Sequence, residues 1–196
     1  MILIDNLHKY FTNEFDLSEL DSIKLRYSLE LIISDLSKCI ILLVLFSILG
    51  KTPDYVYSLL ALLMIRSFTG GLHFKKYIGC MIFTGLFFCI SILLKTHISL
   101  NFTVLSTLFI FSSFTIIYFA PLCHKSRPNY SNQKRNKFKL ISIILLSFHF
   151  ISCFFASKNP YLINSVWVMS LQSFQILIAK GVNIYEKRKL NLKKTT

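Results

Sequence analysis

The sequence predicts an all-α, polytopic membrane protein in which six transmembrane helices follow an N-terminal amphipathic helical segment. More than half of the 196 residues are hydrophobic (54%), only 16% are charged, and the mean hydropathy is +0.57, which is typical of a membrane protein. The apolar residues gather in six runs separated by short charged loops. Glycine is scarce, which favours long helices over a fold rich in turns.

The N-terminal segment, residues 1–30, carries most of the acidic side chains. In "DLSELDSIKLRYSLEL" apolar residues recur every three or four positions, and Ser18 with Asp21 resembles a helix-capping box. We therefore expect an amphipathic helix here, lying on the membrane surface or against the bundle.

Six apolar runs follow, at residues 36–49, 55–65, 77–94, 102–122, 140–156 and 161–179. A helix needs about 20 apolar residues to cross the hydrocarbon core. The last four runs are long enough to cross the membrane, and the first is long enough if its helix begins near Leu31. The second is short, between Pro53 and Arg66, so it would thin the bilayer or continue into backbone sheltered by protein. We expect one membrane domain over residues 1–196, with the six-span bundle at 31–180 and a basic cytoplasmic tail at 181–196.

The net charge of +13 is carried mainly by the loops after the second, fourth and sixth runs. Clustered Lys and Arg can indicate nucleic-acid binding, but charge confined to short loops between apolar runs indicates orientation in a membrane instead. We therefore expect no nucleic-acid partner, and we expect both termini and the second and fourth loops to face the cytoplasm. The fourth loop, "HKSRPNYSNQKRNKFK", would either set topology alone or also bind anionic lipid headgroups or an acidic peptide.

The five cysteines do not indicate a disulfide framework or a metal site. No CxxC pair occurs, and Cys123-His124 has no second pair to complete a zinc site. No cofactor is expected either.

The stretch "RSFTGGLHFKKYIGC", residues 66–80, is either a charged turn between spans or an active site. A cysteine nucleophile needs its thiolate form and a base that can take and return a proton. Cys80 opens the third apolar run, where the positive end of a helix and the nearby Arg66, Lys75 and Lys76 would favour the thiolate. His73 is the one imidazole within reach in sequence, so the two could form a Cys-His dyad.

The spacing of the pair sets a condition on this dyad. Seven residues along an unbroken helix would separate the two side chains by about 10 Å, too far for a hydrogen bond of about 3 Å. The chain must therefore bend between them. Gly70 and Gly71 before the histidine, and Gly79 before the cysteine, supply backbone freedom, with a helix starting near Tyr77.

The pattern Arg66, Gly70-Gly71, His73 and Cys80, in a cytoplasmic loop after a short second span, resembles the accessory gene regulator B (AgrB) family. These proteins are membrane cysteine endopeptidases, or thiol proteases, of Gram-positive quorum sensing. The resemblance covers essentially the whole chain in length, span count and loop charge. It implies that His73 is the catalytic base and Cys80 the nucleophile, with Arg66 and the glycines supporting them.

The resemblance is less complete around the end of the fourth run. Ala120-Pro121 matches a feature of the family, whereas "SRPNY" departs from its commoner order of residues. This departure affects what can be carried over to the fourth loop and leaves the dyad unchanged.

The resemblance also implies a substrate, a short AgrD-like precursor with an amphipathic leader, a pheromone segment and an acidic tail. The enzyme would cleave off the tail and cyclise the rest toward a thiolactone or lactone. Lys75, Lys76, Lys125 and Arg127 are candidates for binding the acidic tail, and membrane lipids and a second copy in a homodimer are the other expected partners.

The sequence selects neither a third catalytic residue nor the oxyanion donors. Asp35, Asp54 and Asn129 could each orient His73, and backbone N–H groups at the start of the third span could bind the oxyanion. The alternative functions are a small transporter or a membrane scaffold without peptidase activity. A transporter would ordinarily carry more ionisable groups within its spans.

Overall fold

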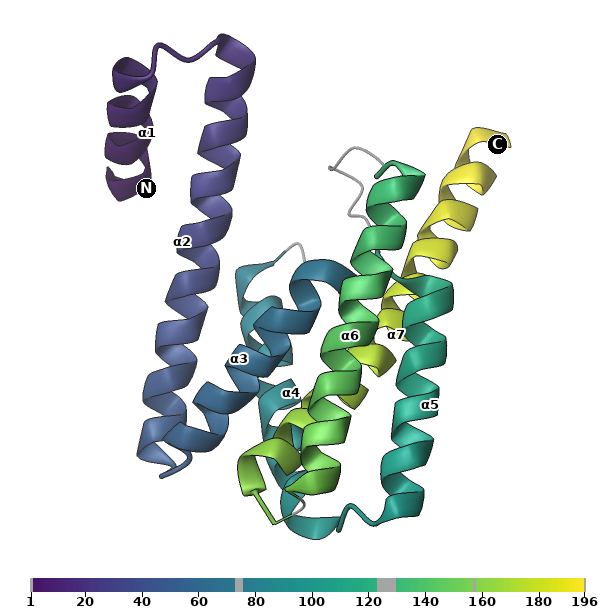
Figure 1. Cartoon of the computed structure of the whole chain (residues 1–196). Helices are drawn as coiled ribbons and strands as arrows, with labels where there is room; N and C mark the ends of the chain where they lie inside the picture. Colours follow the sequence, from purple (N-terminus) through teal and green to yellow (C-terminus); the bar gives the residue numbers. More distant parts are fainter. Residues whose placement is uncertain (1, 73–75, 123–129, 157, 196) are drawn as a thin grey trace. The chain divides into compact units, whose positions relative to one another are not determined.

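The computed structural model describes residues 2–72, 76–122, 130–156 and 158–195, and for residues 2, 3 and 186–195 the backbone alone. Over these ranges the chain forms seven helices, so the all-α prediction is confirmed (Figure 1). Their bounds are α1 Ile2–Glu14, α2 Glu19–Ile48, α3 Thr52–Thr69, α4 Tyr77–His97, α5 Phe102–Phe119, α6 Asn132–Phe155 and α7 Pro160–Thr195. The chain divides into two compact units, residues 1–52 and 53–196.

The first unit is a helical hairpin made of α1 and α2. The Ser18 hydroxyl accepts a hydrogen bond from the Asp21 N–H (3.3 Å) and donates one to the Asp21 carboxylate (2.8 Å), which confirms the predicted cap. The α1 helix is tied to α2 by a hydrogen bond between His8 and the Ser22 hydroxyl (2.9 Å). The predicted amphipathic helix and the first predicted span are one continuous helix of 30 residues, α2.

The second unit is built around α7, which packs against α4, α5 and α6. The α3 helix is tied to α7 through Asn164, whose amide donates to the Ser58 hydroxyl (2.7 Å) and to the Asp54 carbonyl (3.2 Å). The α7 helix is also the most buried of the long apolar helices, with 67% of its apolar window inside the protein. It is therefore the central helix of this unit.

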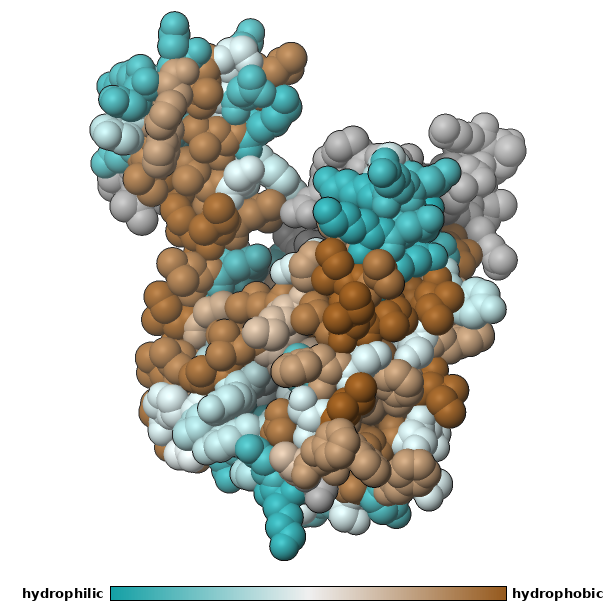
Figure 2. Space-filling model, viewed as in Figure 1, coloured by the Kyte–Doolittle hydropathy of each residue, from teal (hydrophilic) through white to brown (hydrophobic). Residues whose placement is uncertain are grey.

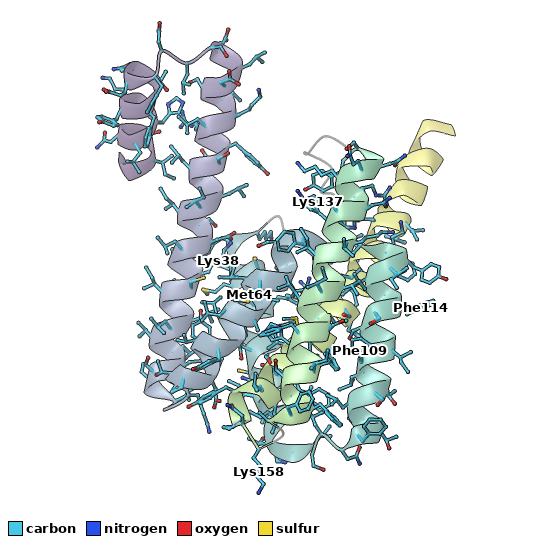
Figure 3. The ribbon with its side chains drawn as sticks, in the orientation of Figure 1. Lys38, Met64, Phe109, Phe114, Lys137 and Lys158 are labelled. Carbon is cyan, nitrogen blue, oxygen red and sulfur yellow. The ribbon has the colours of Figure 1, made fainter. Side chains whose placement is uncertain are left out.

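Five helices are long and apolar enough to cross a membrane, namely α2, α4, α5, α6 and α7. The α3 helix, which corresponds to the short second run, is not among them; it has 18 residues and includes Asp54 and Arg66. Large hydrophobic side chains are exposed on all of these helices, the face drawn in Figure 2 is hydrophobic over much of its area, and Phe114 on α5 points away from the bundle in Figure 3. Large apolar side chains exposed over several long helices indicate contact with lipid, so the chain is a multi-pass membrane protein.

Most helix boundaries agree with the apolar runs, and the differences have local causes. The α4 and α5 helices begin at Tyr77 and Phe102, as predicted, and the Asn101 side chain caps α5. The α6 helix begins at Asn132, eight residues before its apolar run, because Ser131 caps it and Lys, Arg and Gln in its first turns are good helix formers. The α7 helix continues without a break into the basic tail.

The two ends of the second unit differ in charge. One end carries Arg66, Lys76 and the four basic residues of the first turns of α6 (Lys134, Arg135, Lys137 and Lys139). In Figure 2 the start of α6 is a hydrophilic cap above a hydrophobic band. The opposite end carries Lys95 and Lys158, and Figure 3 shows Lys137 and Lys158 at opposite ends of α6. The end that carries Arg66 is called the basic end below.

Candidate active site

The chain bends directly after α3, in the Gly70-Gly71 turn. Gly70 has a φ of +72°, a backbone conformation that residues with a side chain rarely adopt. A Cβ on Gly70 would collide with the backbone carbonyl oxygen of Leu122, in the segment that follows α5. The Leu122 N–H donates to the Thr69 carbonyl (2.9 Å), so the turn packs closely against this segment. Only glycine fits at position 70.

Arg66 braces the same turn from within α3. Its Nη2 donates to the Leu72 carbonyl oxygen (2.9 Å), the last described group before residue 73. A Cβ on Gly71 would lie 3.3 Å from Cζ and Nε of Arg66, so even a methyl group here would press on the guanidinium. The structure therefore brings Arg66, Gly70 and Gly71 together.

Gln172 on α7 also holds the turn, and sequence reasoning missed it. Its Nε2 donates to the Gly70 carbonyl (2.7 Å) and lies 3.2 Å from the Thr69 hydroxyl. Both Gln172 and Thr69 are fully buried. One signal in the sequence could have drawn attention to Gln172, because burying an amide inside an apolar run costs free energy unless it finds a partner. Nothing in the sequence indicated that this partner would be the turn.

Cys80 lies in the opening turn of α4, at the basic end. It is half-buried and is not in a disulfide. Its N–H donates to the Lys76 carbonyl (3.2 Å), and its carbonyl accepts a hydrogen bond from the Thr84 hydroxyl (2.9 Å). Lys76, the N-cap residue, is exposed and makes no side-chain cap. A bend was expected at Gly79 as well as at Gly70. Gly79 is instead part of the α4 helix, and only Gly70 of the two has a positive φ.

Several predicted site residues lie outside the described residues, namely His73, Lys75, Lys125, Arg127 and Asn129. Asp54, one of the candidates for orienting His73, forms an ion pair with Lys95 at the end of α3 opposite the Gly70-Gly71 turn. Its carboxylate is therefore already paired, and the helix places it about 22 Å from Thr69 at the other end of α3. Asp35 belongs to the other unit and pairs with Lys38 (2.9 Å).

These features define a helical multi-pass membrane protein with a half-buried cysteine at the start of one span and a braced glycine turn at the end of the preceding helix. A family model described as accessory gene regulator B matches residues 4–176, and the chain belongs to this AgrB family of quorum-sensing regulators.

Curated relatives match over most of their length. The chain is 35% identical to an AgrB-like protein of Clostridium beijerinckii over 188 residues, which covers 92% of this chain and 90% of the relative. It is 24% identical to AgrB-like protein 1 of Clostridium perfringens over 84% of this chain and 89% of the relative. It is also 24% identical to the accessory gene regulator protein B of Staphylococcus haemolyticus, with 79% and 82% covered. No solved structure matches the chain.

Proposed function

We propose that the chain is a membrane-embedded cysteine endopeptidase that removes the C-terminal tail from an AgrD-like precursor peptide and cyclises the remainder. Family membership supports the choice of substrate. The observation that carries the proposal is the braced turn between α3 and α4. Arg66 and Gln172 hold residues 70–72, immediately before His73, and Cys80 opens the next helix.

In the first step the Cys80 thiolate attacks the carbonyl carbon at the junction of pheromone segment and tail. The C–S bond forms, the scissile C–N bond breaks, and protonated His73 gives its proton to the departing amine. The tail leaves and a thioester joins the pheromone segment to Cys80.

In the second step a thiol or hydroxyl within the pheromone segment attacks the thioester. Neutral His73 takes the proton of this nucleophile, the new thioester or ester closes the ring, and Cys80 leaves as thiolate. Water must be kept away from the intermediate, because hydrolysis would give a linear peptide. The Cys80 N–H is already bonded to Lys76, so the oxyanion donors would be N–H groups of the preceding turn, such as those of Ile78 and Gly79.

The proposed topology puts the basic end of the second unit, both termini and the catalytic connection in the cytoplasm, because basic loops stay on that side. The α3 helix would be a sixth, short span. The acidic tail of the precursor would meet Lys75, Lys76, Lys125 and Arg127 at this end, while its leader lies on the same leaflet. A homodimer would bring two such sites into one assembly.

The test is co-expression of the chain with an epitope-tagged AgrD-like precursor, followed by mass spectrometry of the peptides. Cys80→Ala and His73→Ala are compared with wild type and with Cys89→Ala. Cys89 is a matched control, since it lies on the same helix and is also half-buried and outside any disulfide. Wild type and Cys89→Ala should release the tail and leave a peptide lighter than the linear form by one water. Normal processing by Cys80→Ala would refute the proposal and favour a scaffold or transporter.

A further inference from the structure

A buried amide from α7 reaches the turn between α3 and α4. The hydrogen bond from Gln172 Nε2 to the Gly70 carbonyl is 2.7 Å long and joins residues 102 positions apart. The Thr69 hydroxyl, which donates to the Ile65 carbonyl (3.0 Å), is a second acceptor for the same amide group. Gln172 therefore connects the central helix of the bundle to the backbone three residues before His73.

Packing alone does not account for a glutamine at this position. Gln172 is 0% exposed, and burying an amide costs free energy unless its polar atoms find partners. Its Oε1 has no hydrogen-bond partner among the described residues, so the amide is only half satisfied. A leucine or methionine would fill the same volume without this cost. What the amide supplies, and an apolar side chain would not, is the donor to Gly70.

Gln175 provides the contrast. It lies one turn further along α7 and is almost as buried (2% exposed), but neither Nε2 nor Oε1 has a partner among the described residues. The two glutamines thus share residue type, helix and burial. They differ in whether the side-chain amide donates a hydrogen bond to the turn.

Three hydrogen bonds, donated from three different segments, hold three of the four carbonyls from Thr69 to Leu72. Leu122 N–H binds the Thr69 carbonyl, Gln172 binds the Gly70 carbonyl, and Arg66 binds the Leu72 carbonyl. Without Gln172 the Gly70 carbonyl would lose its shorter hydrogen bond and keep the 3.2 Å contact from the Thr69 hydroxyl, at the residue with the greatest conformational freedom. A rotation here would change the direction in which the backbone leaves α3.

We propose that Gln172 is a positioning residue, which sets the direction of the connection that carries His73 by fixing the Gly70 peptide. This inference rests on the proposed function, in which His73 acts on Cys80. Displacing a catalytic group by about 1 Å can lower turnover by about 100-fold without weakening substrate binding. Loss of the Gln172 donor should therefore lower kcat by about 10- to 100-fold and change KM by less than about threefold.

The experiment compares Gln172→Met with Gln175→Met in the full-length chain, purified and reconstituted into proteoliposomes. Release of the tail from an AgrD-like precursor is followed over a range of precursor concentrations, so that kcat and KM are separated. Thermal unfolding is measured on the same samples. Gln172→Met should lose kcat with KM nearly unchanged, whereas Gln175→Met should keep both and be at least as stable as wild type. Equal losses in the two variants would mean that the amide matters only for packing, and the proposal would be wrong.

Thr69→Val is the second variant and decides the case if Gln172→Met does not fold. It removes the hydroxyl that accepts from the Gln172 amide and that also donates to the Gly70 carbonyl (3.2 Å), so this carbonyl is held less firmly and kcat should fall by about two- to fivefold. If Gln172→Met folds and keeps the wild-type kcat, the proposal is wrong. If Gln172→Met does not fold, the proposal is wrong when Thr69→Val keeps the wild-type kcat. Cys80→Ala distinguishes failure of the proposed peptidase function from failure of the positioning role of Gln172. If Cys80→Ala still releases the tail, the proposed function fails; if it is inactive while Gln172→Met is fully active, the positioning role alone fails.

Discussion

Replacement of Gly70 by alanine perturbs the braced turn at its tightest point. The new Cβ would collide with the Leu122 carbonyl, and φ at +72° is itself strained for a residue with a side chain. The strain costs roughly 1–2 kcal/mol. The collision should also break the bonds from Leu122 to Thr69 and from Gln172 to Gly70, each contributing roughly 0.5–1.5 kcal/mol. The free energy of unfolding should therefore fall by about 2–5 kcal/mol.

Two other glycines serve as graded controls for this prediction. Gly50 has nearly the same φ, +65°, but a Cβ there would meet nothing within 4 Å, so Gly50→Ala reports the strain alone. In Gly71→Ala the Cβ would press on the flexible Arg66 side chain at 3.3 Å, which should displace the guanidinium at lower cost. Loss of stability should rank Gly70→Ala above Gly71→Ala.

The assay combines thermal unfolding in detergent with the rate of tail release from the precursor. Gly70→Ala should lose turnover by at least about 100-fold, because the connection to His73 is redirected. Gly50→Ala should keep turnover close to wild type. If Gly70→Ala were as stable and as active as Gly50→Ala, the close contact between the turn and Leu122 would not exist in the membrane.

Three further outcomes follow from the structure. Arg66→Met removes the donor to the Leu72 carbonyl and should lower kcat by about 10-fold, measured by tail release; unchanged kcat would argue against a brace. Lys95→Met leaves the buried Asp54 carboxylate without its ion-pair partner and should lower the free energy of unfolding by about 3–5 kcal/mol, measured by thermal unfolding. The double variant Asp54→Asn, Lys95→Met should recover most of this loss. Equal losses in the single and double variants would contradict the ion pair. Iodoacetamide should abolish tail release through Cys80 and EDTA should leave it unchanged, whereas loss of activity in EDTA would point to a metal.

Helix positions were predictable where the signal is local. The α4 helix begins at Tyr77 and α5 at Phe102 because a polar or charged stretch gives way abruptly to an apolar run there. The early start of α6 at Asn132 was not predicted, since hydropathy does not register a helix made of Lys, Arg and Gln that is capped by Ser131. The continuity of α2 was missed for a related reason, because its amphipathic half and its apolar half differ in pattern but not in conformation.

The candidate site was predictable only in part, because part of it is non-local. Gly70 and Gly71 are adjacent in the sequence, so the bend was predictable from one short motif, whereas the hydrogen bond from Arg66 to the Leu72 carbonyl was not. Gln172 and Leu122 reach the turn from other helices or their ends, and no spacing in the sequence encodes those contacts. The pairing of Asp54 with Lys95 at the other end of α3 is likewise a contact between helices that no spacing in the sequence encodes.

In the proposed mechanism Cys80 carries the peptide as a thioester. The most direct measurement uses an AgrD-like precursor whose internal thiol or hydroxyl has been removed, so that ring closure cannot discharge the intermediate. Intact-protein mass spectrometry followed by peptide mapping should then find the pheromone segment attached to Cys80, and hydroxylamine should release it. Attachment of the pheromone segment to another residue would contradict this mechanism. So would release of the tail without an adduct on Cys80, if that release continued in Cys80→Ala.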